Sequence, residues 1–210
     1  MPRHRSSILS IALMMLAASS FAGQFNAVVD IGAPLPSFSN LPTTAGGTLS
    51  SSELREDVVV LVFLANHCPW VQGMDGDLVR LVSELDPKGV RVVGVSVNHR
   101  EDDRLPAMKE HAKANGYNFK YVFDESQALG RALGATRTPE YFVFDKGRKL
   151  VYMGAIHNSP ARRAGEEIRY TRGAPSEFHV KDAVLATLAG KGVAVPETRA
   201  HGCSVEYEKK

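Results

Sequence analysis

The residues of this sequence best suited to chemistry are its two cysteines, Cys68 and Cys203. Cys68 comes directly after an apolar, β-branched run that predicts a buried strand, and Pro69 follows it. Proline is favoured at the first position of a helix, so this order predicts that Cys68 is a helix N-cap. There the helix dipole and free amide hydrogens stabilise a thiolate relative to a thiol. We therefore expect a nucleophile at Cys68; the alternative is an inert cysteine that packs like a small hydrophobic residue.

Cys203 lies near the C-terminus, and its role depends on whether it reaches Cys68. In a redox interpretation, Cys203 resolves a sulfenic acid or a mixed disulfide on Cys68. In a structural interpretation, the two form a permanent bridge that closes a loop of about 135 residues and contributes ~4–5 kcal/mol. In a third interpretation, both thiolates bind copper or zinc with one or more of His67, His157 and His201. The sequence leaves these three interpretations open, together with a fourth in which the two cysteines are unpaired.

The hydrophobic pattern predicts the elements that must position these residues. Continuous apolar runs predict strands covered on both faces, and apolar residues at helical spacing predict helices. The turn signal at residues 145–148 joins the last two strands as a hairpin. The predicted order is β-α-β-α-β-α-β-β-α, with strands at 57–65, 90–97, 121–123, 140–144 and 149–154 and helices at 69 to near 89, 105–116, 126–133 and 180–188.

This alternation predicts an α/β fold with a central mixed sheet, mostly parallel, and helices on both faces. Residues 24–56 are expected to add an N-terminal extension of short strands and loops, and residues 157–175 a loop whose arginines are either solvated or bind an anionic ligand. No clear periodicity is present in residues 193–210. Residues 98–100, Asn-His-Arg, follow the second strand at the same sheet edge as Cys68, either as substrate contacts or as a solvated loop.

The first 22 residues have the pattern of a secretory signal peptide. Arg3 and Arg5 precede an apolar stretch, and small residues flank the expected cleavage site after Ala22. The apolar stretch of about eleven residues is too short to span a bilayer, so no membrane span is expected after cleavage. The predicted location is therefore secreted or periplasmic, an oxidising compartment in which disulfides persist.

The composition is that of a globular protein, with 210 residues, 44% hydrophobic and 23% charged. We expect one domain at residues 23–210. Without Arg3 and Arg5, the 25 basic residues fall to 23 and balance the 23 acidic ones. A neutral chain lacks the basic field that general nucleic-acid binding needs, so no nucleic-acid partner is expected. No cofactor is expected either.

Several segments together resemble the thioredoxin-like superfamily, and more closely its redoxin branch, the alkyl hydroperoxide reductase and thiol-specific antioxidant type. Residues 65–71 read ANHCPWV between strand and helix, and Arg137-Thr138-Pro139 precedes the hairpin. The segments IGAPLPSFSNL, FVFDKGRKLVYMG and GCSVEY are similar to a redoxin-like subgroup. The resemblance covers about residues 30–205 and implies a thioredoxin-like fold with an N-terminal extension.

The resemblance also implies roles for individual residues. The Thr138-Pro139 bond is expected to be cis beside the nucleophilic sulfur, with a backbone that pairs with an extended substrate. Arg137 is expected to stabilise the thiolate, and Trp70 to form an apolar docking surface or a core contact. His67 is either a catalytic base or an exposed loop residue.

Three positions depart from the family pattern. Val71 stands where thioredoxins carry the second cysteine of CxxC, so no disulfide can close within the motif. Ala65 replaces the Thr or Ser that orients the peroxide in peroxiredoxins. Val62 replaces the buried acid of thioredoxins.

The resemblance implies thiol–disulfide exchange or peroxide reduction, with Cys68 as nucleophile and Cys203 as the resolving partner. The expected partners are a protein thiol or disulfide, or a small peroxide, and an external thiol reductant. The alternative from another class is a catalytically silent thioredoxin-fold protein. In it the Cys68–Cys203 bridge is structural and the groove at Pro139 holds a peptide.

Overall fold

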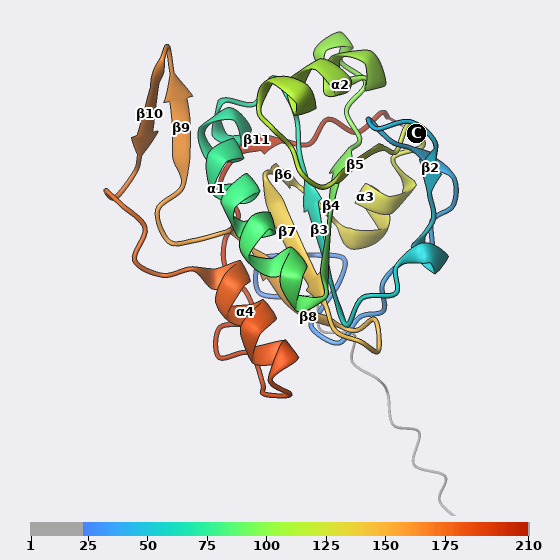
Figure 1. Cartoon of the computed structure of the whole chain (residues 1–210), viewed down its shortest axis with the longest axis vertical. Helices are drawn as coiled ribbons and strands as arrows, with labels where there is room; N and C mark the ends of the chain where they lie inside the picture. Colours follow the sequence, from blue (N-terminus) through green and yellow to red (C-terminus); the bar gives the residue numbers. More distant parts are fainter. Residues whose placement is uncertain (1–22, 210) are drawn as a thin grey trace, which may run out of the picture.

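A five-stranded mixed sheet forms the centre of the molecule (Figure 1). The computed structural model describes residues 23–209, so the predicted signal peptide lies outside the described residues. The strand order is β5-β4-β3-β7-β8. Strands β3, β4 and β5 are parallel, and β7 and β8 form an antiparallel hairpin next to β3. The bounds are β3 (Val58–Phe63), β4 (Val90–Ser96), β5 (Lys120–Phe123), β7 (Glu140–Phe144) and β8 (Leu150–Gly154).

The continuous apolar run of β3 is explained by cover on both faces. All six of its residues are buried. Because successive side chains of a strand point to opposite faces, Val60 and Val62 join one core cluster, whereas Leu61 and Phe63 join the other. The central strand thus holds two apolar layers together, as the sequence predicts.

Four helices cover the sheet: α1 (Pro69–Leu85), α2 (Leu105–Ala114), α3 (Ala128–Leu133) and α4 (His179–Leu188). Buried residues of α1, α2 and α4 pack in the first core cluster. Leu129 and Leu133 of α3 pack in the second, together with apolar residues of the N-terminal segment. The predicted α/β class and the order of the elements are confirmed.

Shorter elements complete the chain: β1 (Leu41–Pro42), β2 (Thr48–Leu49), three 3-10 turns at Ser51–Glu53, Asp86–Lys88 and Glu101–Asp103, β6 (Arg137–Thr138), β9 (Ala161–Ala164), β10 (Glu167–Tyr170) and β11 (Cys203–Ser204). In the described residues, no helix is long and apolar enough to cross a membrane.

The expectation of a loop at residues 157–175 is wrong, because β9 and β10 form an antiparallel hairpin there. The hairpin lies so close to α1 that a Cβ at Gly73 would be 2.5 Å from the Cα of Arg162. Most of its side chains are exposed, including Arg162, Arg163 and Arg169. It therefore lacks the apolar alternation by which a strand is recognised in a sequence.

The C-terminal segment, which has no periodicity in the sequence, is bound along its length. It first follows β8, where the N–H of Thr198 donates to the carbonyl oxygen of Met153 at 3.0 Å. It then crosses the end of the sheet and pairs with β6 through β11 (Figure 1). Beyond β11, the Tyr207 hydroxyl donates to the carbonyl oxygen of Ala135 at 2.8 Å. This path carries Cys203 to the sheet end where α1 begins.

Candidate active site

Cys68 occupies the joint between β3 and α1. It is the N-cap of a 17-residue helix, with Pro69 in the first turn, and its carbonyl oxygen accepts the N–H of Gln72 at 3.0 Å. The predicted N-cap position is therefore confirmed. The side chain is fully buried at 0% exposure. A reactant can therefore reach this sulfur only after a change in the neighbouring residues.

The Thr138–Pro139 bond lies beside this sulfur and is cis. The Cys68 thiol donates a hydrogen bond to the carbonyl oxygen of Thr138 at 3.1 Å. The backbone of the Thr138–Pro139 segment thus lies against the sulfur, where the resemblance to thioredoxin-like proteins places it.

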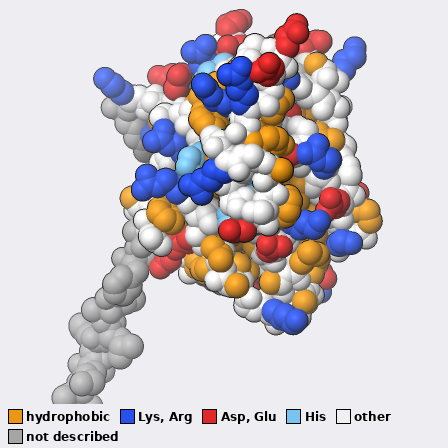
Figure 2. All heavy atoms as spheres, turned by 90° about the vertical axis from the view of Figure 1, so that its left-hand side faces the viewer, with side chains coloured by type: hydrophobic (Ala, Val, Ile, Leu, Met, Phe, Trp, Pro, Cys, Tyr) orange, Lys and Arg blue, Asp and Glu red, His pale blue; other side chains and the backbone are white. Residues whose placement is uncertain are grey.

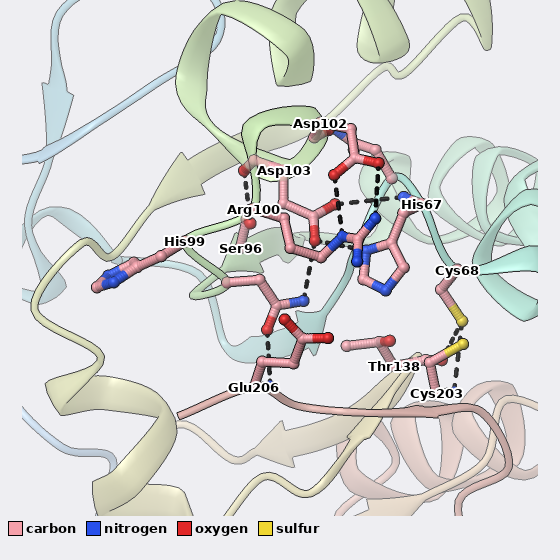
Figure 3. Close-up of polar contacts among 12 residues, drawn as sticks. His67, Cys68, Ser96, His99, Arg100, Asp102, Asp103, Thr138, Cys203 and Glu206 are labelled. Atoms are coloured by element: carbon pink, nitrogen blue, oxygen red, sulfur yellow. Dashed lines mark hydrogen bonds and ion pairs between the residues drawn. The ribbon is translucent and has the colours of Figure 1, made fainter. Parts of the chain in front are cut away.

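Cys203 completes this arrangement from the C-terminal segment (Figure 3). In the pairing of β11 with β6, Cys203 lies opposite Thr138. The N–H of Cys203 donates to the Cys68 sulfur at 3.4 Å. Both residues are free thiols in this structure. The backbone edge expected to pair with a substrate is therefore occupied by the chain's own β11.

Gly202 allows this close approach. A Cβ at this position would lie 1.9 Å from the carbonyl oxygen of Thr138. Only glycine fits there without moving the C-terminal segment away from β6.

The two thiols differ in their surroundings. Burial, followed by the hydrogen bond to Cys68 and the charge of Cys68, raises the pKa of Cys203 to about 12. Cys203 is therefore protonated at neutral pH. The expectation that the helix dipole favours a thiolate at Cys68 stays a prediction.

His67 is neither an exposed loop residue nor free to rotate. Its Nδ1 atom lies 2.6 Å from Oδ2 of Asp103, and its backbone N–H donates to Oδ1 of the same carboxylate at 3.3 Å. Asp103 is fully buried, and the His67 side chain is 16% exposed. The imidazole next in sequence to the buried thiol is thus held by a buried carboxylate.

Further hydrogen bonds hold this carboxylate and link it to the C-terminal segment (Figure 3). The buried Asn98 donates to Asp103 at 3.0 Å, and its Oδ1 accepts the N–H of Glu206 at 3.0 Å. Ser96 donates to the carbonyl oxygen of Asp103 at 3.0 Å. One network therefore joins His67 to the segment that carries Cys203.

Sequence reasoning missed Asp103 and did not decide the place of Asn98. The available signal was their position after the second parallel strand, at the sheet edge where Cys68 was expected. Thioredoxins carry a buried acid at the position that Val62 occupies here. In this protein Asp103, from the loop after β4, provides a buried acid beside His67 instead.

The residues considered as metal ligands with the cysteines are not assembled into one site. His157 contacts Asp77 at 3.0 Å, and Nδ1 of His201 contacts the backbone of Arg199. Among the described residues, the one cluster with ligand spacing is His67, Asp102 and Asp103, which includes no cysteine. Its carboxylates are already paired with Arg100 and His67. The metal interpretation of the two cysteines is therefore not supported.

Arg137 and Trp70 lie together at one side of the site. Both line a groove of about 790 Å³ next to Gly202. Arg137 is exposed and donates to the Ser204 hydroxyl at 2.9 Å. The half-buried Trp70 also packs against the first core cluster, so the two expected roles of this residue are compatible.

Comparisons with known proteins agree with this geometry. The model of the AhpC/TSA family matches residues 31–153, a range that includes Cys68 and Pro139 but not Cys203. No curated protein sequence matches the chain.

Several solved structures are similar to the chain. An uncharacterized conserved protein from Geobacillus kaustophilus is 29% identical with a TM-score of 0.77, covering 88% of this chain and 96% of its own. A hypothetical protein from Sinorhizobium meliloti 1021 is 26% identical with a TM-score of 0.75, covering 88% and 98%. A thiol:disulfide interchange protein of the thioredoxin family from Chlorobium tepidum is 22% identical with a TM-score of 0.54, covering 75% and 97%, and shows the fold alone.

The family membership supports a general redox role. Since the matched range spans more than half of the 210 residues and contains the strand, helix and cis-proline that meet at Cys68, the chain belongs to the AhpC/TSA family of thioredoxin-like redoxins.

Proposed function

We propose that this protein is a thiol–disulfide oxidoreductase in which Cys68 is the nucleophile and Cys203 the resolving cysteine. The observation that carries the proposal is the pairing of β11 with β6, which holds Cys203 against the Cys68 sulfur. A local CxxC is absent because residue 71 is valine. The C-terminal segment supplies the second thiol instead.

The first step is attack of the Cys68 thiolate on a substrate disulfide. A sulfur–sulfur bond forms between Cys68 and one half of the substrate, the substrate disulfide breaks, and the other half leaves as a thiolate. The helix N-terminus at Cys68 favours the attacking charge.

In the second step, Cys203 attacks the Cys68 sulfur and releases the remaining half of the substrate as a thiolate. Cys203 loses its proton in this step. Two of the causes that raise the pKa of Cys203, after burial, are the hydrogen bond and the charge of Cys68. Both are removed once Cys68 is in a mixed disulfide, so its pKa falls and Cys203 becomes reactive only after Cys68 has reacted. The substrate disulfide is reduced to two thiols, and an external thiol reductant then reduces the Cys68–Cys203 disulfide.

His67 supports both steps from its place beside Cys68. The buried Asp103 carboxylate lies 2.6 Å from Nδ1 of the ring and fixes its orientation, and a histidine so held next to a thiol is a candidate for moving protons during the exchange. Asp103 acts through His67 and is therefore a positioning residue.

The variant Cys203→Ser tests the proposal. With a small disulfide, it should accumulate a stable mixed disulfide on Cys68, detected by intact mass and peptide mapping, because no second thiol can release it. The matched Cys68→Ser variant should form less adduct, since burial, the largest cause of the raised pKa of Cys203, remains and Cys203 has no helix N-terminus beside it. If Cys203→Ser forms no adduct and only melts at a lower temperature, the bridge is structural and the proposal is wrong.

A peroxide is a second candidate substrate, because the chain belongs to the AhpC/TSA family. In that case the Cys68 thiolate attacks one peroxide oxygen, the O–O bond breaks, the other oxygen leaves as water or an alcohol, and Cys68 becomes a sulfenic acid. The Cys203 thiol then condenses with this sulfenic acid to the same disulfide, with release of water. Ala65 offers no hydroxyl to orient the peroxide, which favours the disulfide substrate. Hydrogen peroxide added to Cys203→Ser distinguishes the two, since only a peroxidase rapidly forms a sulfenic acid on Cys68.

The proposed location of the protein is secreted or periplasmic. This proposal rests on the predicted signal peptide with cleavage after Ala22. N-terminal sequencing of the exported protein should give Gly23 as the first residue.

A further inference from the structure

The groove next to the two cysteines has walls from three parts of the chain. Trp70 begins α1, Arg137 belongs to β6, and residues 199–202 precede Cys203. Arg137 directly precedes Thr138, which pairs with Cys203 and accepts the hydrogen bond of the Cys68 thiol. A molecule bound in the groove would therefore lie next to Gly202, the residue before Cys203.

The charged side chains of this groove are mostly basic. Arg137 and Arg199 both line it, and within residues 23–209 neither guanidinium is paired with a carboxylate. Glu140 is the one acidic residue of the described lining. Its Oε2 atom accepts the backbone N–H groups of Thr136 and Arg137 at 2.7 and 3.0 Å, and it is only 5% exposed. Glu140 is thus turned to the backbone and forms an ion pair with neither arginine.

Further basic side chains lie next to the groove. Arg199 and His201 also line an adjoining cavity of about 360 Å³, together with Arg172 and one acidic residue, Glu177. Figure 2 looks at the side of the molecule that carries α4 and the β9–β10 hairpin, and it shows Lys and Arg side chains gathered around a histidine in its left part. Such a field attracts anions and raises their rate of encounter.

The volume of the groove and the occupied backbone edge at Thr138 indicate that the groove binds a small molecule. An extended peptide would bind by adding a strand to the edge at Thr138, but β11 already pairs with that edge. A volume of about 790 Å³ is in the range of small-molecule pockets.

Building on the proposed thiol–disulfide exchange, we propose that this groove binds a small disulfide or thiol that carries carboxylate groups, and that Arg137 and Arg199 pair with those carboxylates. Trp70 provides the apolar wall for the carbon skeleton. Arginine suits this role because its planar guanidinium binds a carboxylate through two parallel hydrogen bonds. The exchange itself remains the one described above, with the carboxylate-bearing thiols as leaving groups.

The test compares two disulfides with the same skeleton, dithiodiglycolate with two carboxylates and its neutral diamide. The rate of Cys68–Cys203 disulfide formation is measured with each reagent at low salt. Each rate is divided by that of the same reagent with 2-mercaptoethanol, which removes differences in intrinsic reactivity. The variants are Arg199→Gln and, as a matched control, Arg55→Gln, whose exposed side chain lies before β3 at the opposite end of the sheet.

We expect a normalised preference of about tenfold for the dicarboxylate, reduced by high salt. Arg199→Gln should lower this preference several-fold, whereas Arg55→Gln should retain it. Equal normalised rates, or a preference that Arg199→Gln leaves unchanged, would overturn this inference alone. Reaction with neither reagent would overturn the proposed exchange, and this inference with it. Faster reaction with the disulfide of an acidic peptide than with dithiodiglycolate would overturn the assignment to a small molecule.

Discussion

Replacing Gly202 by alanine should separate the two thiols without removing either of them. A Cβ at residue 202 would lie 1.9 Å from the carbonyl oxygen of Thr138, whereas ordinary contacts begin at 3.4 Å. All three atoms nearest to this Cβ belong to the backbone of Thr138 and Pro139, so the C-terminal segment must move by about 1.5 Å. Cys203 then no longer lies against Cys68.

The size of the effect follows from the hydrogen bonds that this movement breaks. Val205 donates to the carbonyl oxygen of Thr136 at 3.0 Å, and the N–H of Cys203 donates to the Cys68 sulfur at 3.4 Å. At about 1 kcal/mol for each bond, their loss weakens the docking by about 2 kcal/mol. The effective concentration of the Cys203 thiol at Cys68 should therefore fall by roughly thirtyfold.

The assay is equilibration of each variant in glutathione redox buffers, followed by quantification of the Cys68–Cys203 disulfide by mass spectrometry. Gly192→Ala is the matched control, because no atom lies within 4 Å of a Cβ built there. That variant should keep the wild-type effective concentration. A Gly202→Ala protein within twofold of wild type would refute the reasoning that β11 positions Cys203.

Two further predictions concern the polar networks. Asp103→Asn should lower the free energy of unfolding at pH 7 by about 2 kcal/mol, because the fully buried carboxylate accepts hydrogen bonds from Asn98 and from the backbone N–H of His67; urea unfolding at the wild-type midpoint would contradict this role. Tyr170→Phe should lower the free energy of unfolding at pH 7 by about 1 kcal/mol, since its hydroxyl donates to the Asp77 carboxylate at 3.0 Å. Burial raises the pKa of Asp77, but its hydrogen bonds outweigh burial and keep the pKa below the usual 3.8. Urea unfolding should therefore show a difference between the two proteins that is full above pH 4 and fades as the pH falls further, and equal stabilities at pH 7 would contradict the interaction.

Features encoded by neighbouring residues were accessible from the sequence. A buried strand followed by cysteine and proline predicts an N-cap thiol, and the structure confirms that position for Cys68. The order of strands and helices follows in the same way from runs of apolar side chains, as in β3. In each case the determining interactions lie within a few residues of one another.

Features that depend on distant contacts were not accessible. The pairing of Cys203 with Thr138 is set by the path of the C-terminal segment across the sheet, and no periodicity in that segment reports it. Asp103 follows Glu101 and Asp102, a pattern typical of a solvated loop, yet it is the one that is fully buried beneath His67. Only the folded chain shows which of these acids reaches the site.

The reduction potential of the Cys68–Cys203 couple tests the central claim most directly. Measured against glutathione, a reversible couple between about −270 and −120 mV, the range of thiol–disulfide enzymes, is the predicted result. A couple below about −300 mV would identify a permanent structural bridge, and failure of the two residues to form a disulfide at any potential would show that Cys203 does not resolve Cys68.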